Sequence, residues 1–233
     1  MSYKHALLQL AIASSILIPG DAYSNIVLNG DFESPGLPPT SPRLYEVGNS
    51  IGGWTVLGPD GADVAVINGP FTQFGLTFTH QSGVQSLDLT GLTNTTAGVT
   101  QSLPTVAGNS YDLTFYLGNV QSVGIWGVAS SVQVRLNDSL FATATYSEGP
   151  SNAIAWKRFD YNFVATGAMT SLAFINLDGR SDNVNQIDNI SVVATIPEPS
   201  TALLLALGLL GAFAKRSGFH VNRYSTEPIT AGD

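Results

Sequence analysis

The feature that most constrains the fold of this chain is a succession of short runs in which apolar and polar residues alternate, across residues 25–193. In the run DLTFYLGN, Leu113, Phe115 and Leu117 fall on one face of an extended chain, because successive side chains of a strand point to opposite faces. The runs SVQVRLND and FDYNFVA alternate in the same way, and helical periodicity is almost absent. Short strands with turn residues between them predict an all-β fold of the sandwich type.

About ten short strands are predicted, and they lie within residues 25–33, 53–58, 62–69, 85–91, 98–106, 110–119, 130–138, 139–146, 156–165, 169–179 and 185–194. Hydrophobic residues make up 44% of the chain, which is enough for a packed core and argues against global disorder. The chain has no cysteine, so it has no disulfide, no thiolate nucleophile and no cysteine-based zinc site.

Acidic residues dominate the charge of the predicted domain. Residues 25–193 contain thirteen acidic and five basic side chains, and the whole chain has a formal net charge of −8 at pH 7. Such a surface repels a phosphate backbone, so we expect no nucleic-acid partner. It suits divalent cations and neutral glycans, and it also suits simple solubility.

The first 24 residues have the three parts of a secretory signal peptide. Lys4 gives a positive amino-terminal region, residues 6–18 form an apolar run, and a proline–glycine pair ends that run. Ala22 and Ser24 then place small residues at positions −3 and −1 of a cleavage site. The sequence therefore predicts an exported protein that is cleaved after Ser24.

Residues 194–216 contain a second apolar segment, predicted to be helical. Pro197, Glu198 and Pro199 come first, the fourteen uncharged residues 201–214 follow after Ser200, and Lys215 and Arg216 close the segment. Fourteen helical residues span about 21 Å, which is short of the ~30 Å hydrocarbon core of a bilayer. The basic pair would stay on the cytoplasmic side of a membrane.

In this order, these features resemble a PEP-CTERM sorting signal of Gram-negative bacteria. The resemblance implies recognition and processing by an exosortase, a membrane enzyme, and at least transient insertion of the hydrophobic helix into the membrane. Such signals usually end soon after the basic residues, whereas residues 217–233 continue here as a polar tail. An ordinary membrane anchor is the alternative.

The central domain, residues 25–193, resembles the galactose-binding-like jelly roll. The resemblance lies in the order of NGDFE, GWTV, GVTQSL, SYDLTFYLGN and IDNISVV. Similar orders occur in many carbohydrate-binding modules and in an uncharacterised-domain family shared by plant cell-wall proteins and exported bacterial proteins. The resemblance implies a β-sandwich that contacts glycans, although one fold serves many functions.

The same resemblance implies a structural calcium ion held between the first and last strands. Glu33 and Asp188 are the expected ligands, with Asp31 and Asn29 as further candidates. Calcium takes six to eight oxygen ligands, which these side chains and nearby carbonyl groups would supply. Surface carboxylates or turn caps are the alternative interpretation of these residues.

A tryptophan in a glycine- and serine-rich loop is the candidate for ligand binding. Trp126 lies in GNVQSVGIWGVASS, where a large ring has little reason to be packed, and Asn119 and Gln121 lie close by in sequence. Loops at the end of a sandwich often carry function. The alternative is a tryptophan that covers the rim of the core.

Two catalytic patterns fit poorly. Residues 48–52 match G-x-S-x-G around Ser50, but a predicted strand follows where a hydrolase needs a helix, and His80 is the single histidine of residues 25–193. A glycosidase pair of carboxylates needs a cleft that no pattern indicates.

The sequence therefore predicts a non-catalytic protein of the cell surface, outer membrane or extracellular matrix that contacts extracellular polysaccharide. A structural or adhesive matrix component without a sugar site is the alternative, and a secreted hydrolase is a weaker one.

Overall fold

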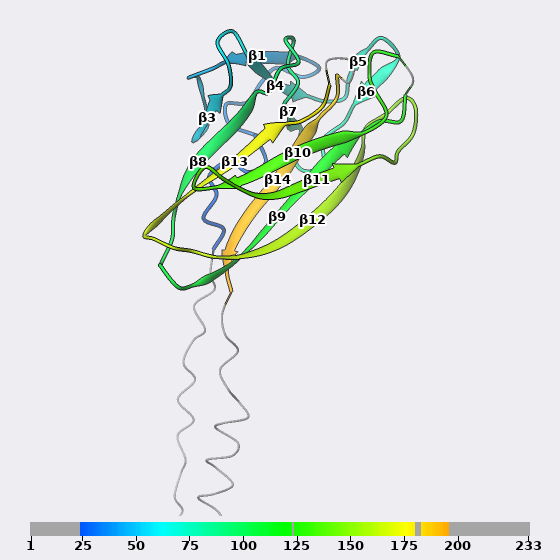
Figure 1. Cartoon of the computed structure of the whole chain (residues 1–233). Coiled ribbons are helices and arrows are strands. Elements are labelled where there is room, and N and C mark those ends of the chain that lie inside the picture. The colour runs from blue at the N-terminus through cyan, green and yellow to red at the C-terminus, as the bar shows by residue number, and fades with distance from the viewer. Residues whose placement is uncertain (1–23, 123, 180–182, 196–233) are drawn as a thin grey trace, which may run out of the picture. The chain divides into compact units, whose positions relative to one another are not determined.

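The computed structural model describes residues 24–122, 124–179 and 183–195 (Figure 1). The regular secondary structure in these ranges consists of β-strands. None of these residues forms an apolar helix long enough to cross a bilayer. The predicted signal peptide (1–24), apart from Ser24, lies outside the described residues. So do nearly all of the sorting segment (194–216) and the whole tail (217–233).

Two six-stranded antiparallel sheets form the domain and confirm the predicted β-sandwich. The first sheet has the order β1 (Pro42–Glu46), β4 (Asp63–Asn68), β7 (Gln85–Asp88), β14 (Gln186–Ala194), β9 (Ser110–Asn119) and β12 (Ala155–Val164). The second has the order β11 (Ser139–Tyr146), β10 (Ser130–Leu136), β13 (Met169–Asn176), β8 (Gly98–Pro104), β3 (Trp54–Leu57) and β2 (Ser50–Ile51). A separate hairpin joins β5 (Phe71–Gln73) to β6 (Leu76–Phe78).

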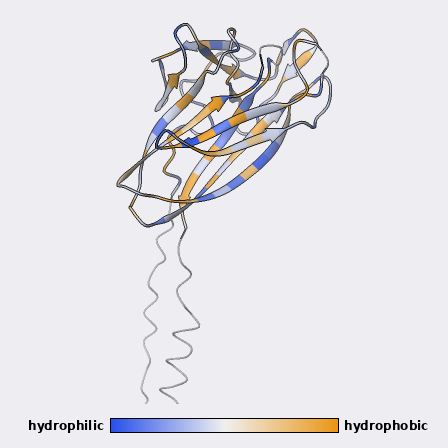
Figure 2. Ribbon diagram, in the orientation of Figure 1, coloured by the Kyte–Doolittle hydropathy of each residue, from blue (hydrophilic) through white to orange (hydrophobic). Residues whose placement is uncertain are grey.

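The core consists of the alternate residues that both sheets direct inward. Leu113, Phe115 and Leu117 of β9 are fully buried, as the alternation predicts, and Phe115 packs edge-on against Phe174 of the opposite sheet. Figure 2 shows apolar residues interspersed with polar ones along the strands. The pattern follows from the two-residue period of a strand with one buried face.

The segment 25–33 is not the predicted strand. Asn29 and Phe32 have φ values of 52° and 55°, which a strand does not allow. The Asn29 side chain accepts a hydrogen bond from Ser34 N at 2.8 Å and donates one to Ser34 O at 2.6 Å. Asparagine side chains compete with the backbone in this way and favour turns.

The first and last segments of the domain nevertheless lie together, as expected. Ile26 N donates to Val192 O at 2.9 Å, and Ile190 N donates to Gly30 O at 2.8 Å. A Cβ atom at Gly30 would come within 2.0 Å of Ile190 O, so this close approach requires glycine. The amino-terminal segment is thereby fixed along β14.

Four strands were not predicted, namely β1, β2, β5 and β6. The β5–β6 hairpin packs on a second apolar cluster that lies on the face of the first sheet opposite the core. In β4, Val64 and Val66 belong to the core, whereas Ala65 and Ile67 belong to this second cluster. The other members of the outer cluster are Leu76, Phe78, Val120, Trp126, Ile154 and Val184. The first sheet is therefore partly covered on both faces.

Candidate functional site

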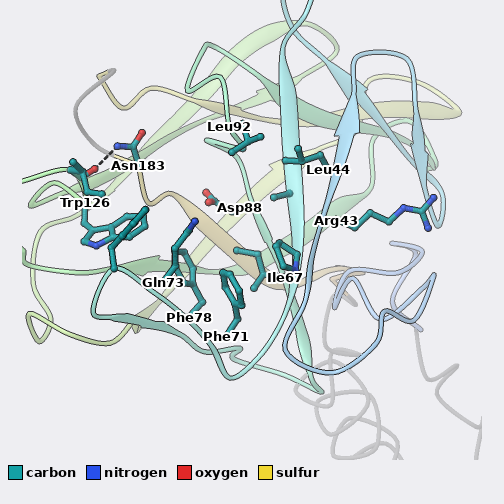
Figure 3. A pocket seen from close by; sticks show the side chains of 15 residues that line it. Arg43, Leu44, Ile67, Phe71, Gln73, Phe78, Asp88, Leu92, Trp126 and Asn183 are labelled. Carbon is teal, nitrogen blue, oxygen red and sulfur yellow. Dashed lines mark hydrogen bonds between the residues drawn. The ribbon is translucent and has the colours of Figure 1, made fainter.

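A cavity of about 600 Å³ lies where the β5–β6 hairpin meets the outer face of the first sheet (Figure 3). We name it the β5–β6 pocket. It is lined by Pro42, Arg43, Leu44, Ala65, Ile67, Phe71, Gln73, Phe74, Phe78, Asp88, Gly91, Leu92, Ile125, Trp126 and Asn183. Its size is that of sites for small ligands.

Aromatic rings form one wall of the pocket. The Trp126 ring packs edge-on against Phe78, with centroids 5.5 Å apart, and lies 6.3 Å from the ring of Phe74. Trp126 is only 9% exposed, so the expectation of a loosely packed loop tryptophan is wrong: the hairpin, which was not predicted, covers it. Phe74 is 78% exposed, so its ring is available to a ligand.

Asp88 lies in the middle of the pocket, on the central strand β7 (Figure 3). Its Oδ1 accepts hydrogen bonds from Thr90 N at 3.0 Å, Thr90 Oγ1 at 2.9 Å and Asn185 N at 3.3 Å. Within the described residues, Oδ2 accepts no hydrogen bond. One carboxylate oxygen therefore anchors the side chain, and the other is left for a ligand.

Burial raises the pKa of Asp88 from 3.8 to about 6. The hydrogen bonds from Thr90 and Asn185 oppose this rise, and the nearby negative charge of Asp63 adds to it. The carboxyl group is therefore mostly ionised at pH 7 and mostly protonated at pH 5.

Two other polar groups at the rim, those of Arg43 and Asn183, are held by their own contacts. The Arg43 guanidinium lies 5.1 Å from the centre of the Tyr45 ring and points away from Asp88 (Figure 3). Asn183 donates a side-chain hydrogen bond to Ile125 O and accepts one from Asn94 Nδ2 at 3.1 Å. The bond to Ile125 O ties the loop that carries Trp126 to the segment that precedes β14.

Asn119 and Gln121 do not line the pocket with Trp126. The Asn119 amide is buried and donates to Glu148 O at 2.9 Å, while its oxygen accepts from Ser130 Oγ at 3.0 Å. The Gln121 amide is exposed and donates to Ser147 O at 2.8 Å. Their closeness to Trp126 in sequence therefore does not bring them to its ring.

The predicted calcium ligands hold one loop in place. Glu33 Oε1 accepts hydrogen bonds from Val84 N at 2.6 Å and Gln85 N at 2.7 Å. Asp188 Oδ2 accepts from Gln81 N at 2.8 Å and Ser82 N at 2.9 Å. The two carboxylates thus bind the two ends of residues 81–85.

Amides thus occupy several of the oxygens that a calcium ion would need. Asp188 Oδ1 is also engaged, by Asn189 N at 2.6 Å, and Asn29 Oδ1 accepts from Ser34 N. In the described part of the chain, no group of three or more His, Cys, Asp or Glu side chains could hold a metal ion. Burial raises the pKa of Asp188 to about 7, the backbone amides of Ser82, Gln81 and Asn189 oppose the rise, and Asp31 adds to it.

The residues of the hydrolase alternative lie apart in the fold. Ser50 belongs to β2 at the edge of the second sheet, whereas His80 follows β6, next to Gly69. Over the ranges that the structure describes, their side chains form no hydrogen bond with each other. Of the described residues that line the pocket, Asp88 is the single carboxylate, so the pocket offers no pair of acids.

The sequence offered one overlooked signal for this site. FTQFGLTF contains three phenylalanines around a glycine, in the pattern of two short strands joined by a two-residue turn. Asp88 was placed inside a predicted strand, but nothing local indicated that a hairpin would cover that face.

Comparisons with solved structures found carbohydrate-binding modules. The CBM22-1 xylan-binding domain from Paenibacillus barcinonensis Xyn10C is 15% identical, with a TM-score of 0.44, over 75% of this chain and 97% of that one. TmCBM61 in complex with beta-1,4-galactotriose is 16% identical, with a TM-score of 0.42, over 74% and 99%.

A GH26-CBM35 beta-(1,4)-mannanase from Podospora anserina is 16% identical, with a TM-score of 0.39. The match covers 69% of this chain but only 29% of the mannanase. A comparison with curated proteins found no similar sequence.

Comparisons with protein families matched both parts of the chain. Residues 195–217 match the PEP-CTERM protein-sorting motif, which confirms the predicted sorting signal and marks an exported protein sorted to the cell surface. Residues 25–192, the whole sandwich, match a family described as a protein of unknown function (DUF642). The chain therefore belongs to the DUF642 family and has a PEP-CTERM sorting signal behind its DUF642 domain.

Proposed function

We propose that this exported protein binds extracellular polysaccharide through the β5–β6 pocket and acts without catalysis. The observation that carries the proposal is the Asp88 carboxylate, which faces an aromatic wall with one oxygen uncommitted. Ring faces pack against the C–H faces of sugars, and a carboxylate accepts hydrogen bonds from sugar hydroxyls. The combination of an apolar wall with a few polar groups is typical of ligand sites.

Phe74 gives independent support. It has φ = 44°, an unfavourable conformation for a bulky residue, and its ring is 78% exposed. Neither property stabilises the domain. Strained and exposed aromatic residues are found at functional sites, and contact with a ligand explains this one.

The test measures retention of the full chain by the extracellular polysaccharide of its own host, in affinity gels. Hydrogen bonds to charged groups contribute about 1.5–3 kcal/mol, so we expect Asp88→Asn to weaken binding roughly 10- to 100-fold. Phe74→Ala, which removes an exposed ring, should weaken binding by about tenfold and leave folding intact.

Matched controls lie on other surfaces. Asp112→Asn makes the same chemical change at an exposed position of β9, and Leu140→Ala removes a side chain of β11 that is 60% exposed. Both controls should bind like the natural protein. If Asp88→Asn and Phe74→Ala also bind normally, or if the natural protein does not bind at all, a matrix component without a sugar site is the better description.

A further inference from the structure

The β5–β6 pocket has walls around Asp88. Leu92 lies on one side, Trp126 and Asn183 on a second, and Phe71 and Phe78 on a third (Figure 3). Ile67 and Leu44 form the fourth side, from β4 and β1. A polysaccharide held in the middle of its chain needs an entrance and an exit on opposite sides of its site. In Figure 3 lining side chains stand on all four sides of Asp88, which suits a glycan that ends at Asp88 better than one that passes through.

The floor of the pocket is formed by the first sheet. Asp88 pairs directly with Gln186 of β14, so the two side chains lie next to each other on the same face. Gln186 is fully buried, and neither its amide nitrogen nor its amide oxygen has a hydrogen-bond partner. Such an unpaired buried amide is unfavourable and rare. Gln186 does not itself line the pocket, so the polar group that the floor presents to a ligand hydroxyl is Asp88.

The charge inside the pocket has one sign. Asp88 is the ionisable side chain that faces the interior, because the Arg43 guanidinium points outward over Tyr45. A ligand carboxylate at the floor would meet the Asp88 carboxylate without a compensating cation. Neutral hydroxyl groups meet no such penalty.

From the walls around Asp88 and the single sign of charge we infer that the pocket takes the terminal residue, or a single-residue branch, of a neutral glycan, with its hydroxyls at Asp88. The inference rests on the proposed function and specifies its ligand. The volume of about 600 Å³ accommodates a few sugar residues at most. The rest of the glycan would lie outside, past the exposed ring of Phe74.

Partial hydrolysis of the glycan distinguishes binding to chain ends from binding to chain interiors. The host polysaccharide is used intact and after mild acid hydrolysis to one-tenth of its mean length, and the number of binding sites per gram is measured by titration calorimetry. Recognition of ends predicts about ten times more sites after hydrolysis, at unchanged affinity per site. If single-residue branches are bound instead, the affinity of the free monosaccharide should match that of the polysaccharide.

Oxidation of the primary hydroxyls of the same fragments to carboxylates tests the charge requirement. We expect binding at pH 7 to fall by tenfold or more.

The outcomes distinguish this inference from the proposal on which it rests. A site count that does not increase with hydrolysis, together with weak monosaccharide binding, overturns terminal recognition but leaves polysaccharide binding in place. Unchanged binding of the oxidised fragments overturns the preference for neutral ligands. Failure of both intact and hydrolysed glycan to bind the natural protein overturns the proposed function itself.

Discussion

At the scale of single residues, the structure gives two buried carboxylates different tasks. Both oxygens of Asp188 accept backbone hydrogen bonds, and Glu33 holds the other end of the same loop. Asp88 engages one oxygen with Thr90 and Asn185 and turns the other to the pocket. Burial raises the pKa of Asp88 and of Asp188, but only Asp88 is placed to meet a ligand.

The stability of the domain should depend on pH through Asp88. Because its pKa is raised from 3.8 to about 6, the folded protein binds this proton more tightly than the unfolded chain does. The contribution of Asp88 to the free energy of unfolding therefore falls as the pH rises from about 4 to about 6. Asp88→Asn removes this titration, and its side-chain oxygen can still accept the bonds from Thr90 and Asn185.

We expect Asp88→Asn and the natural protein to be about equally stable at pH 4. At pH 7 the variant should be more stable, by up to about 3 kcal/mol at roughly 1.4 kcal/mol for each pKa unit. Urea unfolding at several pH values measures the difference. A difference that does not change with pH would contradict the assigned titration.

Calcium should not be needed to hold the loop of residues 81–85. Glu33 and Asp188 already bind its amides directly, so the melting temperature should be the same with and without excess EDTA. A lower melting temperature in EDTA, restored by added Ca²⁺, would instead support the calcium site expected from the sequence.

At the scale of secondary-structure elements, the turn of the β5–β6 hairpin holds an exposed aromatic residue in an unfavourable backbone conformation. Its two turn residues, Phe74 and Gly75, have φ values of 44° and 80°. Such two-residue turns favour Asn-Gly, because asparagine tolerates this conformation better than phenylalanine does. The ring of Phe74 therefore lies where the turn alone would select a smaller polar residue.

The variant Phe74→Asn separates the two effects. We expect it to raise the free energy of unfolding by about 0.5–1 kcal/mol, since it relieves the turn and loses little buried surface. Polysaccharide retention should fall at the same time, by about tenfold. Thermal melts and affinity gels on one preparation give both values, and a variant that is less stable and binds normally would contradict this account of the turn.

The strands also show which parts of the fold could be predicted from the sequence alone. Ten of the predicted segments contain strands. Long runs of alternating apolar and polar residues, such as that of β9, indicate a strand with one buried face. The strand predicted over residues 25–33 is wrong because hydrogen bonds of the Asn29 side chain to the Ser34 backbone form a turn there. The hairpin strands have three residues each, too few for a periodic pattern to be recognised.

The candidate site was harder to predict than the fold. Trp126 was singled out, but Asn119 and Gln121, chosen for their closeness in sequence, make other contacts. Asp88 comes next to the rings of the hairpin only after β5 and β6 pack on the outer face of the first sheet. That packing joins segments that are far apart in the chain, and no local pattern encodes it.

At the scale of the whole molecule, the sandwich is a separate unit from the segment that carries the sorting motif. The compact unit ends at Ala194, directly before the sorting motif begins at residue 195. We predict that the protein purified from its host begins at Asn25 and ends near Pro197. Mass spectrometry of the intact protein measures both ends; a chain that still begins at Met1 would contradict the signal peptide, and one that ends at Asp233 would contradict processing.

Strand β14 connects two distant parts of the domain. Its last residue, Ala194, lies at the end of the sandwich opposite β5 and β6 (Figure 1). Its first residue, Gln186, pairs with Asp88 at the floor of the pocket. A pull that enters at Ala194 and is resisted by a ligand at Asp88 would run lengthwise along β14. The short ladder between β14 and β7, which pairs Gln186 with Asp88 and Ile187 with Leu87, would then be loaded in shear along the strands. A tether at the carboxyl end of the sandwich would therefore pull parallel to β14 and not across its hydrogen bonds to β7.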